Sequence, residues 1–244
     1  MENKQNPSPR TLALWSAPRA RSTVFFRAMV ERGDHIGLHE PFCNIMDFGA
    51  TTVEGREVHT HRALVGAIRD LSKRRPVFLK DTTDHRYQEV LEDADFLREV
   101  VHTFLVRSPE QIAASYFALR PEMGEGDIGL IQLHELYEAV IDAGGRAIVI
   151  DSEDLVRAPA RTLSAYCREV GIAYDPAALE WEPGGRPEWE RSKRWHVGAS
   201  ESSGIHGTVT EYADTVDNNP MLAAFSDHHR PAYRALRDRK LVIA

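Results

Sequence analysis

The strongest restriction on the fold of this chain is a repeated alternation between strand-length apolar runs and amphipathic helical stretches. The apolar runs are continuous rather than alternating, which is typical of strands that are buried on both faces of a parallel sheet. We expect strands at 11–17, 34–42, 76–80, 102–107 and 146–151, and helices at 22–32, 61–72, 87–100, 108–119, 128–143, 158–171 and 225–239. This order predicts an α/β fold with a central parallel sheet and helices on both of its faces.

The length and composition are those of one domain. The chain has 244 residues, 42% of them apolar, so we expect a single domain over 1–244 with a flexible tail at 1–10. No apolar run reaches about 18 residues and the first residues lack an apolar signal core, so we expect a cytoplasmic protein without membrane contact. Cys43 and Cys167 are too few for a disulfide framework, which fits a reducing compartment.

The charge of the chain limits its partners. A formal net charge of −7 argues against nucleic acid, because phosphate backbones require a basic footprint. Arginines nevertheless gather at 19–21 and at 107, which indicates a local site for a small anionic ligand.

The turn "SAPRARST", residues 16–23, joins the first strand to the first helix. A helix start offers free N–H groups and partial positive charge, Ser22 and Thr23 add hydroxyl donors, and Arg19 and Arg21 add forked charged donors. We interpret the turn as a cradle for an oxyanion; the alternative is that Ser22 only caps the helix and the arginines are solvated. The ATP and GTP phosphate-loop pattern G-x-x-x-x-G-K-[ST] is not met, since Ser16, Arg21 and Ser22 stand at its glycines and lysine.

A second motif, "RSPEQIAAS", follows the fourth strand. Ser108 is a helix N-cap and Pro109 suits the first helical position. Arg107 ends the strand and Ser115 lies in the second helical turn, so both can face one ligand beyond the strand ends.

Together these two motifs resemble the 5′-phosphosulfate loop and the 3′-phosphate motif of sulfotransferases that use 3′-phosphoadenosine 5′-phosphosulfate (PAPS). The chain resembles small bacterial sulfotransferases and sulfotransferase-like proteins more than the animal cytosolic enzymes, over residues 12–170 and, less strongly, beyond. The resemblance implies a P-loop-NTPase-like three-layer fold. It also implies that the 19–23 loop, including Ala20, holds the 5′-phosphosulfate and that Arg107 and Ser115 hold the 3′-phosphate.

The loop departs from the family pattern at two positions. Arg19 stands where the family has a lysine that reaches the bridging oxygen of the phosphosulfate, so charge is kept but the amine is lost. Arg21 stands where the family has glycine. We therefore expect that the backbone at Arg21 does not adopt the conformation that glycine favours.

The reaction implied is transfer of a sulfuryl group from PAPS to a hydroxyl or amine of a small-molecule acceptor, leaving adenosine 3′,5′-bisphosphate and requiring no metal. Arg19 and Lys80 would supply positive charge at the leaving group. The family's usual histidine after the third strand is missing, and Glu40, after the second strand, is the first candidate for the general base. Asp81 and His85 remain rivals.

Further residues are assigned by position. By the period of two, His39 should face the opposite side of its strand from Glu40 and pack in the core. Residues 43–60 show no clear period and are expected to form a substrate-side loop or lid; the acceptor pocket should involve 42–60 and 119–130. The region from 181 to 207 lies where the family covers the nucleotide, which makes Lys193, Arg194 and Trp195 candidates for contacts with the 3′-phosphate and adenine.

Two other functions remain open. A nucleotide or small-molecule kinase would need a phosphate-loop lysine, which the turn at 16–23 lacks. A non-catalytic nucleotide-binding protein of the same fold would explain the departures at Arg21 and at the family histidine. The sequence is also compatible with a homodimer.

Overall fold

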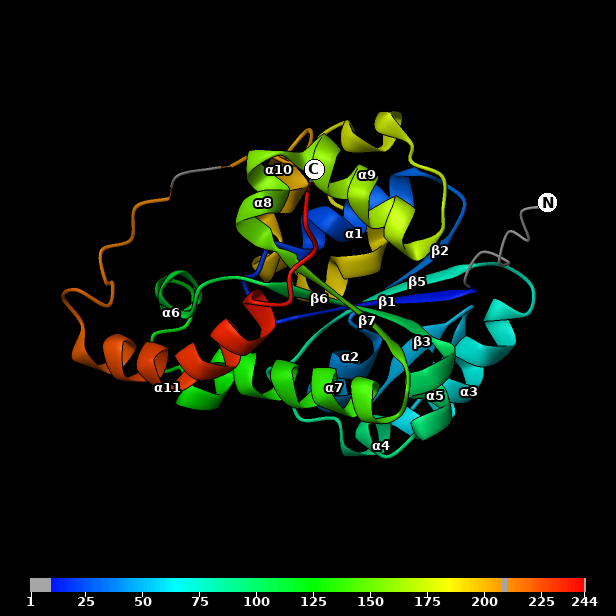
Figure 1. The fold of residues 1–244 in the computed structure, drawn as a ribbon, viewed down its shortest axis with the longest axis horizontal. Helices are drawn as coiled ribbons and strands as arrows, with labels where there is room; N and C mark the ends of the chain where they lie inside the picture. The colour runs from blue at the N-terminus through cyan, green and yellow to red at the C-terminus, as the bar shows by residue number, and fades with distance from the viewer. Residues whose placement is uncertain (1–9, 208–209, 244) are drawn as a thin grey trace.

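The computed structural model describes residues 10–207 and 210–243, and its centre is a five-stranded parallel sheet with the strand order β2-β5-β1-β6-β7 (Figure 1). The strands are β1 Thr11–Ser16, β2 Ile36–His39, β5 Val77–Thr82, β6 Val101–Val106 and β7 Arg146–Asp151. Every strand that the sequence predicts is present, and the parallel pairing is confirmed. Residues 1–9 of the predicted tail lie outside the described residues.

The register of the sheet brings the strand ends together. Ser16, the last residue of β1, pairs with Thr82 on one side and with Leu105 on the other. On the outer strand, His39 pairs with Lys80. Because all five strands are parallel, the residues that follow them meet at one edge of the sheet, where ligands of such folds bind.

Helices cover both faces of the sheet, as predicted (Figure 1). One layer contains α1 Ser22–Glu31, α8 Ser152–Arg157, α9 Pro159–Val170 and α10 Val197–Glu201. The other contains α2 Pro41–Phe48, α3 His61–Ser72, α4 Gln88–Leu91, α5 Ala94–Glu99, α7 Leu130–Asp142 and α11 Pro220–Arg237, while α6 Pro109–Phe117 follows β6. Short 3-10 turns are η1 Glu125–Ile128, η2 Pro176–Leu179 and η3 Pro187–Trp195, and a hairpin joins β3 Thr51–Val53 to β4 Arg56–Val58.

The expectation of an irregular lid at 43–60 is wrong. Pro41 stands at the first position of α2, where its missing N–H costs nothing, and Gly49 ends this helix in a left-handed conformation. The hairpin β3-β4 follows directly. The short apolar pattern had no helical period because only Pro41, Phe42 and Cys43 are buried in this helix.

Two helical predictions also need correction. The helix predicted at 87–100 is broken into α4 and α5, because the Asp93 side chain accepts a hydrogen bond from Phe96 N and starts a new helix. The six-residue helix α8, between β7 and α9, was not predicted.

The segment 181–207 contains η3 and α10 rather than a loose loop, and it is fastened to α1. Trp181 and Trp189 are buried against α1 and its neighbours. The buried guanidinium of Arg27 in α1 donates hydrogen bonds to the carbonyl oxygens of Glu182, Gly184 and Ala199. This segment therefore forms a fixed cover over the start of α1.

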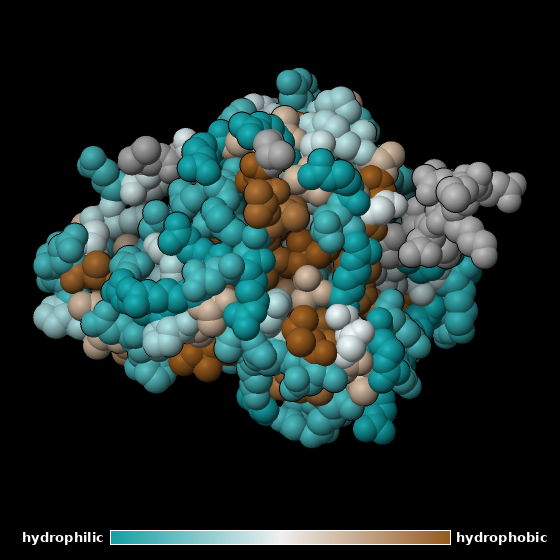
Figure 2. Space-filling view, viewed as in Figure 1, coloured by the Kyte–Doolittle hydropathy of each residue, from teal (hydrophilic) through white to brown (hydrophobic). Residues whose placement is uncertain are grey.

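The end of the chain runs beside the edge strand. Leu241 N donates a hydrogen bond of 2.8 Å to Val149 O of β7. Figure 2 shows that this face is mostly hydrophilic and that hydrophobic side chains gather in its middle, over β7. Among the described residues, no helix has the length and apolar character needed to cross a membrane.

Candidate functional site

One large cavity, of about 1070 Å³, opens at the carboxyl ends of the strands. Its wall combines the turn between β1 and α1, one side of α2, the end of β5, Arg107 with the last turn of α6, and parts of 191–212. These segments are far apart in the sequence, and the parallel sheet brings them to one place. We call the part around the β1-α1 turn the donor side and the part around α2 and the end of β5 the acceptor side.

The turn between β1 and α1 has a backbone that the sequence did not predict. Both Arg19 (φ 61°) and Arg21 (φ 67°) are left-handed, so the expectation that Arg21 avoids the conformation favoured by glycine is wrong. A left-handed residue other than glycine costs about 1–2 kcal/mol. The side-chain contacts of both arginines, given below, help to hold the turn.

Ser22 and Thr23 form the first turn of α1 and both are buried at the cavity wall. Thr23 Oγ1 lies 2.9 Å from His196 Nδ1. Arg21 pairs with Glu153 of α8 at 2.7 Å. The start of α1 thus places the Ser22 and Thr23 side chains at the cavity wall, and the binding of an anion there stays a prediction.

Arg107, Ser115 and Arg19 form a second group on the donor side. Arg19 Nε donates to Ser115 Oγ at 3.2 Å and Arg107 Nη1 donates to Arg19 O at 2.8 Å. Burial, together with the charge of Arg21, lowers the pKa of Arg107 to about 10. Several guanidinium groups packed together without an acidic partner for each favour an anionic ligand.

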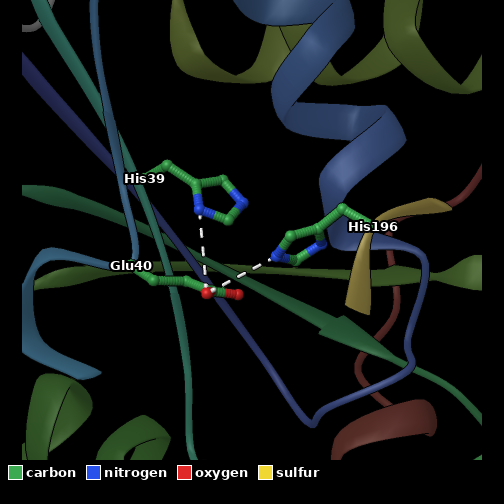
Figure 3. Close-up of side chains that lie close together, drawn as sticks. All are labelled: His39, Glu40 and His196. Atoms are coloured by element: carbon green, nitrogen blue, oxygen red, sulfur yellow. Dashed lines mark ion pairs between the residues drawn. The ribbon is translucent and has the colours of Figure 1, made fainter. Parts of the chain in front are cut away.

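Glu40 lies at the centre of the cavity wall, in a left-handed conformation with φ 50°. Because this residue leaves the strand geometry, His39 and Glu40 do not face opposite sides as predicted: His39 Nδ1 is 3.7 Å from Glu40 Oε2 (Figure 3). His39 is nevertheless a buried packing residue, with its ring against Phe26 and Trp189. His196 Nε2 also lies 3.7 Å from this carboxylate oxygen, and its ring packs edge-on against that of His39, with centroids 4.7 Å apart (Figure 3).

The groups around the Glu40 carboxyl stabilise its ionised form. Burial alone would raise its pKa, but the Lys80 ammonium, with His39 and His196, holds the pKa well below its usual range. Lys80 Nζ donates to Glu40 Oε1, and Lys80 O accepts from Glu40 N at 2.6 Å. Burial lowers the pKa of both histidines, so both are neutral at pH 7.

The donor atoms of His39, Glu40 and His196 lie within 4.8 Å of one another and are of types that ligate metals. The Lys80 ammonium, however, already neutralises this carboxylate. A divalent ion here would meet a like charge at close range, so these residues fit an ion pair better than a metal centre.

Asp81 and His85, the rival bases, lie in different surroundings from Glu40. The Asp81 carboxylate is fully buried and accepts hydrogen bonds from Phe42 N (2.6 Å), Cys43 N (3.2 Å), Thr82 N (2.9 Å) and Tyr87 Oη (3.2 Å). It therefore holds the start of α2, directly after Glu40. His85 lies on the acceptor side and pairs with Asp47 at 2.8 Å.

The three candidate residues of the covering segment lie in different surroundings. Arg194 and Trp195 lie in the cavity wall, but Lys193 is exposed and pairs with Glu190 at 2.8 Å. The Trp195 ring packs on Tyr116, with centroids 5.2 Å apart. Trp195 O also accepts a 2.7 Å hydrogen bond from Arg19 Nη1, which ties the covering segment to the donor turn.

His196 and Ser192 are the site residues that the sequence did not indicate. Ser192 Oγ lies 3.1 Å from His196 Nε2 and donates to Glu40 Oε2 at 3.5 Å. No local motif marks either residue, because both reach Glu40 only through the folding of η3 over the sheet end.

Comparison with known proteins identifies the family. The profile of a sulfotransferase domain matches residues 10–240. The chain belongs to the sulfotransferase domain family. The five-stranded parallel sheet between two layers of helices is the three-layer arrangement that the sequence predicts, and membership of the family supports sulfuryl transfer in general terms.

Two curated relatives come from Arabidopsis thaliana. Branched-chain-amino-acid aminotransferase-like protein 2 is 25% identical over 182 residues, 71% of this chain and 32% of that protein. Branched-chain-amino-acid aminotransferase-like protein 1 is 24% identical over 208 residues, 81% of this chain and 37% of that protein. The sulfotransferase thus spans about a third of the length of these relatives.

Two solved structures are similar. The sulfotransferase domain from the Synechococcus PCC 7002 olefin synthase aligns with a TM-score of 0.40 and 16% identity, over 92% of this chain and 96% of that one. The sulfotransferase domain from the curacin biosynthetic pathway aligns with a TM-score of 0.40 and 14% identity, over 81% and 84%.

Proposed function

We propose that this sulfotransferase moves the sulfuryl group of PAPS to a hydroxyl or amine of a small-molecule acceptor, with Glu40 as general base. The observation that supports this most is the position of the ionised Glu40 carboxylate. It lies in the wall of the open cavity, and the same wall contains the start of α1 and the group of Arg107 and Ser115. A base that faces both a donor site and an acceptor space suits direct group transfer.

The donor side would hold PAPS through two sets of contacts. The start of α1, with Ser22 and Thr23, would receive the 5′-phosphosulfate. Arg107 and Ser115 would receive the 3′-phosphate, for which charged forked donors are well suited. The hydrogen bond that Arg19 now gives to Ser115 is one that a phosphate oxygen would replace.

In the reaction, the acceptor oxygen or nitrogen forms a bond to sulfur while the bond from sulfur to the phosphate oxygen breaks. Glu40 takes the acceptor proton, and adenosine 3′,5′-bisphosphate leaves with the electron pair of the broken bond. Negative charge grows on the leaving oxygen in a loose transition state, and Lys80 and Arg19 supply positive charge nearby.

His196 would connect the donor side of the cavity to the Glu40 carboxylate through its two ring nitrogens. Its Nδ1 lies beside the Thr23 hydroxyl and its Nε2 beside Ser192 and Glu40. A neutral imidazole has one donor and one acceptor nitrogen, so Thr23 donating to Nδ1 leaves the Nε2 proton directed at Ser192 and the carboxylate. This contact would orient the Glu40 side chain toward the acceptor space.

We place the reaction in the cytoplasm. Cys43 and Cys167 are both buried free thiols, as in proteins of a reducing compartment. Fractionation of cells that express the tagged chain would test this placement.

The function is tested by incubating the enzyme with PAPS labelled in the sulfuryl group and a panel of small alcohols and amines. We expect labelled product and an equal amount of adenosine 3′,5′-bisphosphate. Binding of the bisphosphate without any transfer would support a non-catalytic nucleotide-binding protein instead. Transfer from ATP labelled in the γ-phosphate would support a kinase and contradict the proposal.

A further inference from the structure

We propose that the acceptor carries a positively charged amine, which the Asp84 carboxylate binds on the acceptor side of the cavity. This inference rests on the proposed function, because it names the class of acceptor that the same cavity takes. It concerns a residue of this chain that neither the donor motifs nor the reaction requires.

Asp84 follows β5 by two residues and lies in the cavity wall together with Thr82 and His85. Across from them, α2 contributes Cys43 and Asp47. The ion pair between His85 and Asp47 joins the two walls. Asp84 and Glu40 thus line the same cavity. If an acceptor points its reactive group at Glu40, its other end can lie at Asp84.

The other carboxylates of this part of the cavity already have partners. Those partners are Lys80 for Glu40, His85 for Asp47, Arg120 (3.6 Å) for Glu122, and the N–H of Gly124 (2.9 Å) for Asp127. The buried Asp81, behind the wall, has its backbone and tyrosine donors. Among the described residues, Asp84 forms no ion pair within 4 Å; it has a hydrogen bond with the Thr82 side chain and interacts at longer range with His85.

Asp84 Oδ1 is closed off from solvent and has no hydrogen-bond partner among the described residues. The residue as a whole is half-buried and lines the cavity, so a ligand can reach the side chain. Burial raises the pKa of its carboxyl group and the charge of Glu40 raises it further, while the Thr82 hydrogen bond and His85 lower it. A half-buried carboxylate without an ionic partner gains most from a ligand that brings both a positive charge and an N–H donor. A protonated amine brings both.

The Cys43 thiol lies in the same negatively charged surroundings as Asp84. Burial raises the pKa of Cys43, and the charges of Asp84, Asp81, Glu40 and Asp47 raise it further. Because the charge of Glu40 contributes to the raised pKa of Asp84, the two carboxyl groups are near enough for one small molecule to contact both. An amino alcohol would then place its hydroxyl at Glu40 and its ammonium at Asp84.

The test compares two acceptors of equal size, 6-aminohexan-1-ol and heptan-1-ol, in sulfuryl transfer by the wild type and by Asp84→Asn. We expect the wild type to prefer the amino alcohol by about tenfold or more in kcat/KM, as a charged hydrogen bond allows. In Asp84→Asn the preference should fall to near one. Asp70→Asn, an exposed carboxylate of α3, is the matched control and should keep the preference.

Binding gives a second measurement that needs no transfer. Hexylammonium should raise the melting temperature of the wild type more than hexan-1-ol does, and this difference should vanish in Asp84→Asn. Equal effects of the two probes on the wild type, or an amine preference that survives in Asp84→Asn, would overturn the inference. If hexylammonium binds through Asp84 while adenosine 3′,5′-bisphosphate does not bind at all, the proposed function fails and the amine site stands.

Discussion

The donor and acceptor sides of the cavity differ in charge and in how the chain builds them. On the donor side, arginines and a helix start face the cavity, and Arg21 and Arg19 contact Glu153 and Ser115. On the acceptor side, carboxylates dominate and Asp84 has an unpaired oxygen. The comparison teaches that basic groups gather on one side of the cavity and acidic groups on the other, so the two sides suit ligands of opposite charge.

The largest expected effect falls on Glu40, where the two sides meet. Glu40→Gln keeps the size of the side chain but cannot take a proton, so we expect kcat to fall at least about 100-fold while bisphosphate affinity is kept. Steady-state kinetics and calorimetry measure the two quantities. Normal turnover in this variant would remove Glu40 from the reaction.

This variant leaves the buried Lys80 ammonium without its partner, which can destabilise the fold by about 3–5 kcal/mol. The double variant Glu40→Gln, Lys80→Met removes both charges and serves as the folding control. Glu57→Gln, on the exposed hairpin, is the matched control for the carboxylate change and should act as wild type.

The next effect is confined to the donor side. Arg107→Ala should weaken binding of adenosine 3′,5′-bisphosphate by about 30-fold, or about 2 kcal/mol, through loss of a charged hydrogen bond. Binding of AMP, which lacks the 3′-phosphate, should be unchanged. Calorimetry of both nucleotides checks this, with Arg146→Ala, at the opposite end of the sheet, as the control; equal affinity of the wild type for both would contradict the donor assignment.

A smaller effect is expected behind the acceptor side, at Asp81. Asp81→Asn removes one acceptor from the start of α2, so we expect a loss of about 1–3 kcal/mol in unfolding free energy and about a tenfold lower kcat. Burial, then the charge of Glu40, raises the pKa of Asp81 to about 8. At that pKa the Asp81 carboxyl group is protonated in the acidic range where Glu40 titrates, so Asp81→Asn removes no charge there and the acid limb of the kcat profile should stay in place.

Tyr87→Phe is the matched control for Asp81, because it removes one hydrogen bond to the Asp81 carboxyl group and keeps that group. Its acid limb should also stay in place. A limb that moves in Asp81→Asn but not in Tyr87→Phe would show that Asp81 is charged where Glu40 titrates and would contradict this prediction.

The smallest effect lies in the core, away from both sides. Burial lowers the pKa of His102 from 6.5 to about 4, so this side chain is neutral in the fold and must become charged to gain a proton. A depressed histidine pKa means that stability is lost as the pH falls below about 6.5, with a limiting slope of about 1.4 kcal/mol per pH unit. Between pH 7 and 6 we expect His102 to contribute a loss under about 1 kcal/mol, measured by urea unfolding as the difference between the losses of the wild type and of His102→Gln.

The difference between the two sides also explains what the sequence could predict. The sheet and the donor side depend on contiguous patterns: apolar runs for the strands, and Arg107 and Ser115 within one motif for the site. Glu40 was predicted from its place after a strand, and the structure brings it to the cavity wall.

The rest depends on contacts between distant residues or on strained backbone. His196 lies beside Glu40 because Trp189 and Arg27 fasten the covering segment, and no local pattern encodes this. Arg21 takes a left-handed conformation that residue type argues against. The His39 error has the same origin, because a period of two holds only until the strand ends.

The contacts of Arg27 have a consequence for the order of folding during synthesis. This guanidinium lies in α1, directly after the donor turn, but the carbonyl groups that accept its hydrogen bonds stand at least 155 residues later in the chain. During synthesis, the helix emerges from the ribosome long before those carbonyls exist. The first helix of the protein therefore reaches its final surroundings only after the segment that covers it has been made.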